Sequence, residues 1–348
     1  MISLPRGIAL VALQEFRMRL RTGRWRVLLG VWLFVLGGFT LLLDLALNNG
    51  ASAAGANLRG VPLLGILMLF VLACVLIISP TLTSQTINGD RERGTLATLQ
   101  ATRLRPSQIA LGKLTAAWSV GLVMLLMTVP FVLYAMARGG LQFVRVAALY
   151  GVVALLIGVI CAISQAISAM LARSITSALL SYVTVFVLSV GTLIGFALLV
   201  AIVQTPRSID TGSGSYVVYD SRTDLVWPVL APNPFVVLAD SAPRVPPRVT
   251  QNGDVIRVED YDVLSAIGRS IRDLRRPPNA PYTSIETSCT TTDDVTSCGQ
   301  VGYQVITGDP VWPWGLGFDL LLGVGSVAIT IRRLRAPARR LATGVRIA

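Results

Sequence analysis

The sequence predicts an all-α polytopic membrane protein with six transmembrane helices, on the strength of two observations. Hydrophobic residues make up 53% of the 348 residues and charged residues only 14%, with a mean hydropathy of +0.67, which is more apolar than an ordinary soluble domain. Six apolar stretches are also long enough to cross a hydrocarbon core of about 30 Å, which takes roughly 20 helical residues. Each is expected to be a helix, because lipid offers the backbone no hydrogen-bond partner.

The six stretches divide the chain into segments with different expected roles. They cover residues 27–47, 61–82, 114–137, 146–172, 175–203 and 311–331. The domain plan is therefore an N-terminal interfacial (elbow) helix at 1–26, spans one to five at 27–203 with a coupling loop at 83–113, an extracytoplasmic domain at 204–311, the sixth span at 312–331 and a basic cytoplasmic tail at 332–348.

The N-terminal segment is predicted to be a helix at the inner membrane surface. Three of its arginines share one face, which would meet lipid headgroups: Arg17, Arg21 and Arg24. Glu15 and Arg19 interrupt the apolar side of this helix. A solvated basic arm therefore remains an alternative interpretation.

Basic residues predict the orientation of the spans. An even number of spans puts both termini on one side of the membrane. The segments on that side hold eighteen Lys and Arg residues, whereas the short loops on the other side hold only Arg59, Arg138 and Arg145. Because basic residues favour the cytoplasmic side, the sequence predicts an inner or plasma membrane protein with both termini in the cytoplasm.

Composition excludes several classes of function. The chain has no histidine, and Lys113 is its one lysine, which excludes imidazole chemistry and speaks against catalysis or a metal site in this chain. The net charge of +12 does not predict nucleic-acid binding. Residues 204–311 carry −4 and the remainder +16, and those cations flank apolar runs as membrane-side anchors do.

The loop between the second and third spans has the pattern of a short charged helix. Asp90 and Glu92 suit the start of a helix, and Arg103 and Arg105 suit its end, because of the helix dipole. Leu96 and Leu99 then share a face. Such a helix could fit a groove on a partner and pass rigid-body motion to the spans. Spacing alone does not distinguish this from a capped juxtamembrane loop.

The loop also resembles the signature of type-2 ABC-transporter permeases, the six-span membrane subunits of many ABC exporters. The similar residues are the run Glu92-Arg93-Gly94-Thr95-Leu96, then Leu99, Ala101-Thr102 and Ile109-Ala110-Leu111-Gly112-Lys113. Arg103 departs from the family, which usually has proline there, and Pro106 follows three positions later.

The resemblance implies that this loop is the coupling helix, which docks on a cytoplasmic ATPase subunit. The implied coupling residues are Asp90, Arg91, Glu92, Arg93, Gly94, Thr95, Leu96 and Leu99. The chain has no Gly-x-x-x-x-Gly-Lys-Ser/Thr pattern. ATP and Mg²⁺ are therefore expected on a separate ATPase subunit, and this chain is expected to hold no cofactor.

The resemblance further implies two permease subunits, as a homodimer or heterodimer, with the transport path at their interface. The implied lining comes from the second and fifth spans, with Phe70, Tyr182, Phe186 and Phe196 as candidates. Ordinary helix packing or lipid contact is the alternative for each aromatic. An apolar path favours amphipathic or lipid-like cargo.

Residues 204–311 are predicted to form a small, turn-rich domain outside the membrane. Eleven of the eighteen prolines lie there. One helical pattern runs over 259–276, with an apolar face of Val263, Ile267, Ile271 and Leu274 opposite Asp262, Arg269 and Arg272. Cys289 and Cys298 are predicted to form a disulfide on this oxidising side, whereas Cys74 and Cys161 lie in apolar spans as packing residues.

Two further features lie near the outer membrane surface. Residues 227–235 resemble the re-entrant Asn-Pro-Phe segment that family members place before the last span, and a proline-rich loop with a buried aromatic is the alternative. Asp319 lies a few residues into the last span and is expected to be an interfacial residue that pairs with Arg138 or Arg145.

A second class of function stays open on the sequence alone. A membrane anchor or sensor without transport activity would bind a ligand with its outer domain and signal through its loops. A membrane-embedded enzyme is disfavoured, because no convincing nucleophile, base or metal cluster is present.

Overall fold

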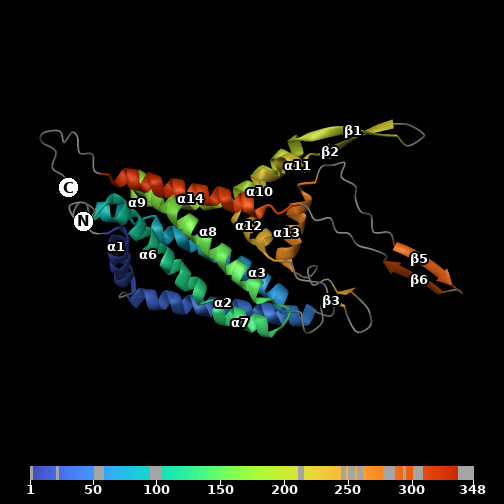
Figure 1. Ribbon diagram of the computed structural model, residues 1–348, viewed down its shortest axis with the longest axis horizontal. Helices are drawn as coiled ribbons and strands as arrows, with labels where there is room; N and C mark the ends of the chain where they lie inside the picture. Colours follow the sequence, from blue (N-terminus) through green and yellow to red (C-terminus); the bar gives the residue numbers. More distant parts are fainter. Residues whose placement is uncertain are drawn as a thin grey trace.

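The computed structural model describes residues 3–20, 23–50, 59–94, 104–210, 215–243, 248–249, 255–256, 262–276, 287–292, 295–300 and 309–335. In this part of the chain six helical runs are long and apolar enough to cross a membrane. The predicted class, an all-α polytopic membrane protein, is confirmed. The spans run side by side along the long axis, and the β-hairpins project from one end (Figure 1).

The first four spans follow their apolar stretches closely. The first is α2 (Gly23–Gly50), the second α3 (Gly60–Thr83) and the fourth α8 (Phe143–Met170). The third is divided into α6 (Pro106–Leu126) and α7 (Val129–Ala137). The division occurs beside Pro130, whose nitrogen cannot donate a helical hydrogen bond. The Thr128 hydroxyl makes hydrogen bonds there with the Leu125 carbonyl and the Tyr150 hydroxyl, both at 2.6 Å.

The fifth and sixth spans complete the bundle. The fifth consists of α9 (Ser174–Phe186), a π-helical turn η2 (Val187–Gly191) and α10 (Thr192–Ile202), and the sixth is α14 (Trp312–Leu334). Burial differs sharply between spans. Of the 18 most apolar consecutive residues in each span, 61% are buried in the second and fourth spans, whereas 6% are buried in the fifth. The core therefore lies around α3 and α8, and the fifth span is peripheral.

Helix α1 (Leu4–Leu20) runs across the ends of the spans, not along them (Figure 1). A helix was predicted here, and its position at the membrane surface stays a prediction. Of the arginines expected to face lipid, Arg17 is exposed. Arg21 lies outside the described residues, and the side chain of Arg24 is not described.

The segment between α10 and α14 contains short helices and three antiparallel hairpins. The helices are α11 (Thr223–Val226), the 3-10 turn η3 (Trp227–Val229), α12 (Pro234–Ser241) and α13 (Val263–Asp273). The hairpins are β1–β2 (Gln204–Asp210, Ser215–Ser221), β3–β4 (Arg248–Val249, Val255–Ile256) and β5–β6 (Thr287–Thr292, Val295–Gln300). The sequence predicted turns here but not the strands.

Helix α13 agrees with the predicted helix at 259–276, with one correction to its buried face. Leu264, Gly268 and Ile271 are buried, whereas Val263 is 38% exposed. The difference arises because Asp262 is the buried N-cap of α13, where its carboxylate accepts from the Ser265 amide. The helix is therefore rotated relative to the predicted face.

Two buried ion pairs attach α12 and α13 to the spans. Arg145 of α8 pairs with Asp262, and Arg272 of α13 pairs with Asp240 of α12. Asp240 also accepts from the backbone amides of Val311 and Trp312, at 2.6 and 2.8 Å, where α14 begins. These contacts hold the short helices against the end of the bundle.

The expected pairing of Asp319 with Arg138 or Arg145 is wrong. Arg138 pairs with Asp44 of α2 at 2.6 Å, and Arg145 pairs with Asp262. Each arginine pairs with a carboxylate from a distant part of the chain, Asp44 in α2 or Asp262 before α13, and the sequence alone does not show that these segments are neighbours. Asp319 is itself buried within the described bundle.

Candidate functional site

The chain after α3 forms a compact turn and the five-residue helix α4 (Asn88–Glu92). Pro80 lies in the last turn of α3, and the Thr86 hydroxyl donates to the Thr83 carbonyl at 2.8 Å. Ile87 is fully buried in a small apolar cluster with Ile109, Ala110, Ala169 and Leu334. This cluster joins α4 to α6, α8 and α14.

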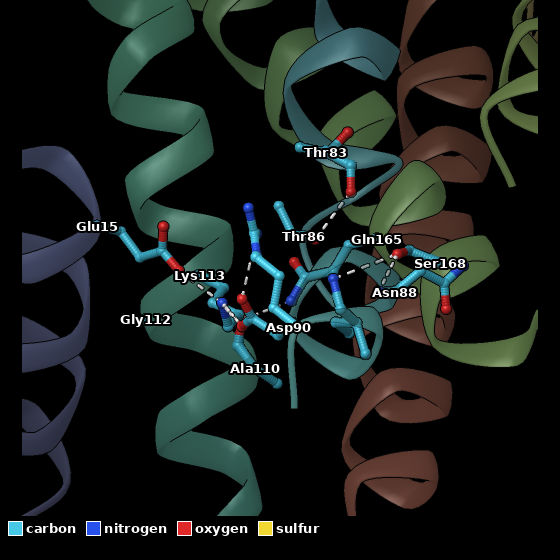
Figure 2. A network of polar contacts seen from close by, with 12 residues as sticks. Glu15, Thr83, Thr86, Asn88, Asp90, Ala110, Gly112, Lys113, Gln165 and Ser168 are labelled. Carbon is cyan, nitrogen blue, oxygen red and sulfur yellow. Dashed lines mark hydrogen bonds and ion pairs between the residues drawn. The ribbon is translucent and has the colours of Figure 1, made fainter. Parts of the chain in front are cut away.

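Lys113 of α6 lies in the centre of a buried polar network (Figure 2). Its ammonium group is 2.5 Å from the Glu15 carboxylate of α1 and 2.5 Å from the Asp90 carboxylate of α4, and its side chain is 1% exposed. Arg93 reaches Asp90 from the surface at 3.5 Å. Because a buried cation is stable only when it is paired, Lys113 holds α1, α4 and α6 together.

Tight packing brings α1 against α6 and so positions Glu15. A Cβ atom on Gly112 would lie 2.6 Å from Val11, and one on Gly7 would lie 2.5 Å from Gln108. The Gln108 side chain also donates to the Ser3 carbonyl at 3.2 Å. The alternative interpretation of this segment as a solvated basic arm is therefore wrong, because the described part of α1 is docked on α6.

A second set of contacts ties α4 to the fourth and fifth spans. The Ser168 hydroxyl of α8 accepts from the amides of Ile87 and Asn88, at 3.3 and 3.2 Å, and Gln165 donates to the Ala110 carbonyl of α6 at 2.9 Å (Figure 2). The turn after α3 is thus bonded to α8 through Ser168, and to the fifth span through the Ser177 hydroxyl of α9, which donates to the Ser84 carbonyl at 2.8 Å.

Arg91 and Glu92 extend these contacts to the connection between α8 and α9. The Arg91 guanidinium donates to the Leu171 carbonyl at 3.0 Å. The Glu92 carboxylate accepts from the Ser174 amide at 3.1 Å, at the N-terminus of α9, where the helix dipole favours a negative charge. Movement of α4 would therefore displace the start of the fifth span through the contact between Glu92 and Ser174.

The structure describes five of the eight predicted coupling residues. Asp90, Arg91 and Glu92 lie in α4, and Gly94 follows with a φ of +71° that suits glycine. Asp90 lies in the first turn of α4, as expected, but α4 ends at Glu92, so the expectation of one helix from Asp90 to near Arg105 is wrong. Thr95, Leu96, Leu99 and Arg103 lie outside the described residues, and Arg105 precedes α6.

The four aromatic candidates for a transport path have different surroundings. Phe70 stacks on Phe39 of α2 with ring centroids 3.9 Å apart. The Tyr182 hydroxyl contacts the Thr81 hydroxyl of α3, and Phe186 is 56% exposed. Phe196 is half-buried on α10. Tyr182 and Phe186 lie on the sparsely packed fifth span.

Residues 227–235 pack between the fifth span and α12 through Asn233. Its buried side chain donates to the Ser189 carbonyl in η2 at 2.6 Å and to the Thr192 hydroxyl at 2.8 Å, and accepts from the Phe235 amide at 2.9 Å. Nearby, the two hydrogen bonds from Arg222 hold the pKa of the Asp224 carboxyl below its ordinary value. The segment is an ordered part of the bundle end.

Sequence reasoning missed the role of Lys113 and Glu15. The signal that was present is the single lysine of the chain at the start of a span, since an ammonium group there requires a carboxylate partner. What the sequence does not give is which carboxylates, because Glu15 and Asp90 are far from Lys113 along the chain.

Comparison with known proteins agrees with this architecture. The family described as ABC-2 family transporter protein matches residues 9–222, which run from α1 through the first five spans to β2. No curated protein and no solved structure matches. Since the match covers more than half of the chain, this membrane protein belongs to the ABC-2 family of transporter proteins.

Proposed function

We propose that the chain is the membrane-spanning permease subunit of an ATP-driven exporter, and that it works with separate ATPase subunits that bind ATP and Mg²⁺. Family membership supports a transporter subunit, and the sequence has no phosphate-binding loop of its own. The observation that carries the coupling proposal is the buried network around Lys113, which connects the loop after α3 to α1 and α6, together with the contacts of that loop with α8 and α9.

The network gives the loop a way to move the spans. Separating Lys113 from Asp90 and Glu15 would leave charges buried without partners, which costs about 3–5 kcal/mol in measured cases. A force applied to Arg93, Gly94 or the residues after them would therefore move α4, α1 and α6 together, and would reach α9 through Glu92. This is rigid-body switching around a partner contact.

We infer that the α1 end of the bundle is cytoplasmic and that two permease subunits, two copies or two homologous chains, meet through the fifth span. The sparse packing of the fifth span supports the contact between subunits, since it leaves Tyr182 and Phe186 on an open face. A path lined by these residues with Phe70 and Phe196 suits amphipathic or lipid-like cargo.

Co-purification tests the proposal directly. The tagged chain, isolated from its own membranes, is expected to bring down an ATPase with Walker motifs. Leu96→Asp in the loop is expected to weaken that association about tenfold, which corresponds to about 1.4 kcal/mol of binding free energy. Val217→Asp serves as the matched control, because Val217 is 58% exposed on β2, at the opposite end.

The same experiment discriminates the alternative function. An assembled ATPase whose ATP hydrolysis falls in the Leu96→Asp complex supports the permease. A chain that brings down no ATPase, while remaining folded and in the membrane, supports an anchor or sensor and overturns the proposal.

A further inference from the structure

Asp319 lies inside the bundle on the sixth span, seven residues after Trp312, which is about 10 Å along the helix. It is 2% exposed and shares a buried face of α14 with Gly315, Leu316 and Gly323. A Cβ atom on Gly315 would meet the Ala231 carbonyl, and one on Gly323 would lie 3.4 Å from Val159 of α8. Asp319 therefore belongs to the face that packs on α8 and on the segment before α12.

Neither carboxyl oxygen of Asp319 has a hydrogen-bond partner within the described ranges. The other two buried aspartates of those ranges are Asp240 and Asp262, and both form ion pairs with arginines. The partly buried Asp44 is paired with Arg138. Asp319 is thus the exception among the described acids that the bundle encloses.

Charged groups on the elements packed against α14 are already engaged or lie at the bundle ends. Helices α8, α6 and α12 make the main contacts with α14. Their charged or titratable residues, with those of α14 itself, are Arg145 (paired with Asp262), Tyr150 (bonded to Thr128), Cys161, Lys113 (paired with Glu15 and Asp90), Asp240 (paired with Arg272), and Arg332 and Arg333 near the far end of α14. None of the cations forms an ion pair with Asp319.

An ionised carboxylate without a partner is very costly in an apolar interior, whereas the neutral acid costs far less. A proton requires no cavity, unlike a larger cation. We propose that Asp319 is a proton-binding site of the sixth span, which holds a proton in the packing described here and releases it to water when the segment around Ala231 moves off Gly315.

The balance between the closed and the open packing at Gly315 depends on pH. The proton passes from the carboxyl oxygen to water and leaves a carboxylate, so opening at Gly315 releases one proton per subunit. Mass action then makes low pH favour the closed packing and high pH favour the open one. This inference does not depend on an ATPase partner or on transport.

Infrared spectroscopy of the purified chain in lipid bilayers tests the proposal. The wild-type chain at neutral pH is expected to show the carbonyl stretch of a protonated carboxylic acid, and Asp319→Asn is expected to lose it. Asp44→Asn is the matched control, since that carboxylate accepts from Arg138 and Tyr134, and it is expected to leave the band unchanged.

Asp319→Glu covers the case in which the asparagine variant does not fold, because it keeps a carboxyl group on the same face. Its band is expected to persist at a shifted frequency. A wild-type spectrum without the protonated-acid band, or a band of equal size in folded Asp319→Asn, would overturn the proposal.

Discussion

At the residue scale, the charged groups around Lys113 balance one another. Glu15 and Asp90 carry two negative charges, and Lys113 and Arg93 carry two positive ones. The lysine is enclosed, while the arginine side chain is 71% exposed. Buried ion pairs add little net stability over an apolar core of the same shape, but removing one member leaves the others uncompensated. The network therefore fixes which helices move together more than it stabilises the fold.

Replacing Lys113 with methionine tests this balance. The variant keeps most of the length of the side chain and removes the enclosed cation from two largely buried carboxylates, of which Asp90 retains its contact with Arg93. We expect the free energy of unfolding to fall by about 3–5 kcal/mol, measured by denaturation in detergent.

The triple variant Lys113→Met, Glu15→Gln and Asp90→Asn provides the comparison. Removing all three charges is expected to restore most of the loss, because no uncompensated charge remains. If the single and triple variants are equally destabilised, the loss comes from side-chain packing and not from the buried charges.

At the element scale, the docking of α1 depends on a glycine. Gly112 lets Val11 approach the backbone of α6, and this approach brings Glu15 to Lys113. We expect Gly112→Ala to push α1 away and to reduce the free energy of unfolding by about 1–3 kcal/mol, as overpacking does. Gly151→Ala in α8 is the control, because no atom lies within 4 Å of its added Cβ.

The control variant sharpens the interpretation of that experiment. Alanine forms helix better than glycine by about 1 kcal/mol, so Gly151→Ala is expected to be neutral or slightly stabilising. Equal effects of the two substitutions would show that helix propensity, not the contact of α1 with α6, decides the outcome.

The β5–β6 hairpin gives the predicted disulfide a concrete basis. The register pairs Cys289 directly with Cys298, and directly opposed residues in antiparallel strands have Cα atoms about 4.5–5.5 Å apart, within the range of a disulfide. The side chains of these strands are not described, so the bond stays a prediction. Non-reducing peptide mapping is expected to find the two peptides linked.

The two cysteines in the spans are the internal reference for that measurement. Cys74 and Cys161 are free and at least partly buried, so they are expected to react with a thiol reagent only after unfolding. Free thiols at Cys289 and Cys298 in protein isolated without reductant would contradict the prediction.

Some of these elements could be predicted from the sequence and others could not. All six spans followed from long apolar runs, because a hydrocarbon core imposes length and composition on any helix that crosses it. Helix α13 followed from its period, but its rotation did not, because Asp262 is turned inward by Arg145. The partners of Lys113, and the absence of a described partner for Asp319, also could not be predicted, since both depend on helix packing between distant segments.

At the scale of the whole molecule, the bundle has a packed centre and a sparsely packed edge. Helices α3 and α8 are enclosed, whereas few residues of α2 and of the fifth span are buried. Polar clusters sit at both ends, around Lys113 at one and around Asp240 and Asp262 at the other. Each end of the bundle therefore has its own polar cluster. The orientation of the bundle in the membrane decides which side of the membrane each cluster faces.

The distribution of basic residues predicts that the Lys113 end is cytoplasmic. Moving a Lys or Arg across the hydrocarbon core costs about 2.5–3.5 kcal/mol at its centre, and eighteen such residues flank the spans on that side against three on the other. We expect Val217→Cys to react with a membrane-impermeant maleimide on intact cells, and Arg93→Cys to react only after permeabilisation. Both side chains are exposed, and the unsubstituted chain gives the background from its own cysteines. The reverse pattern would place the loop after α3 where no ATPase or ATP could reach it, so it would contradict the coupling proposal along with the topology.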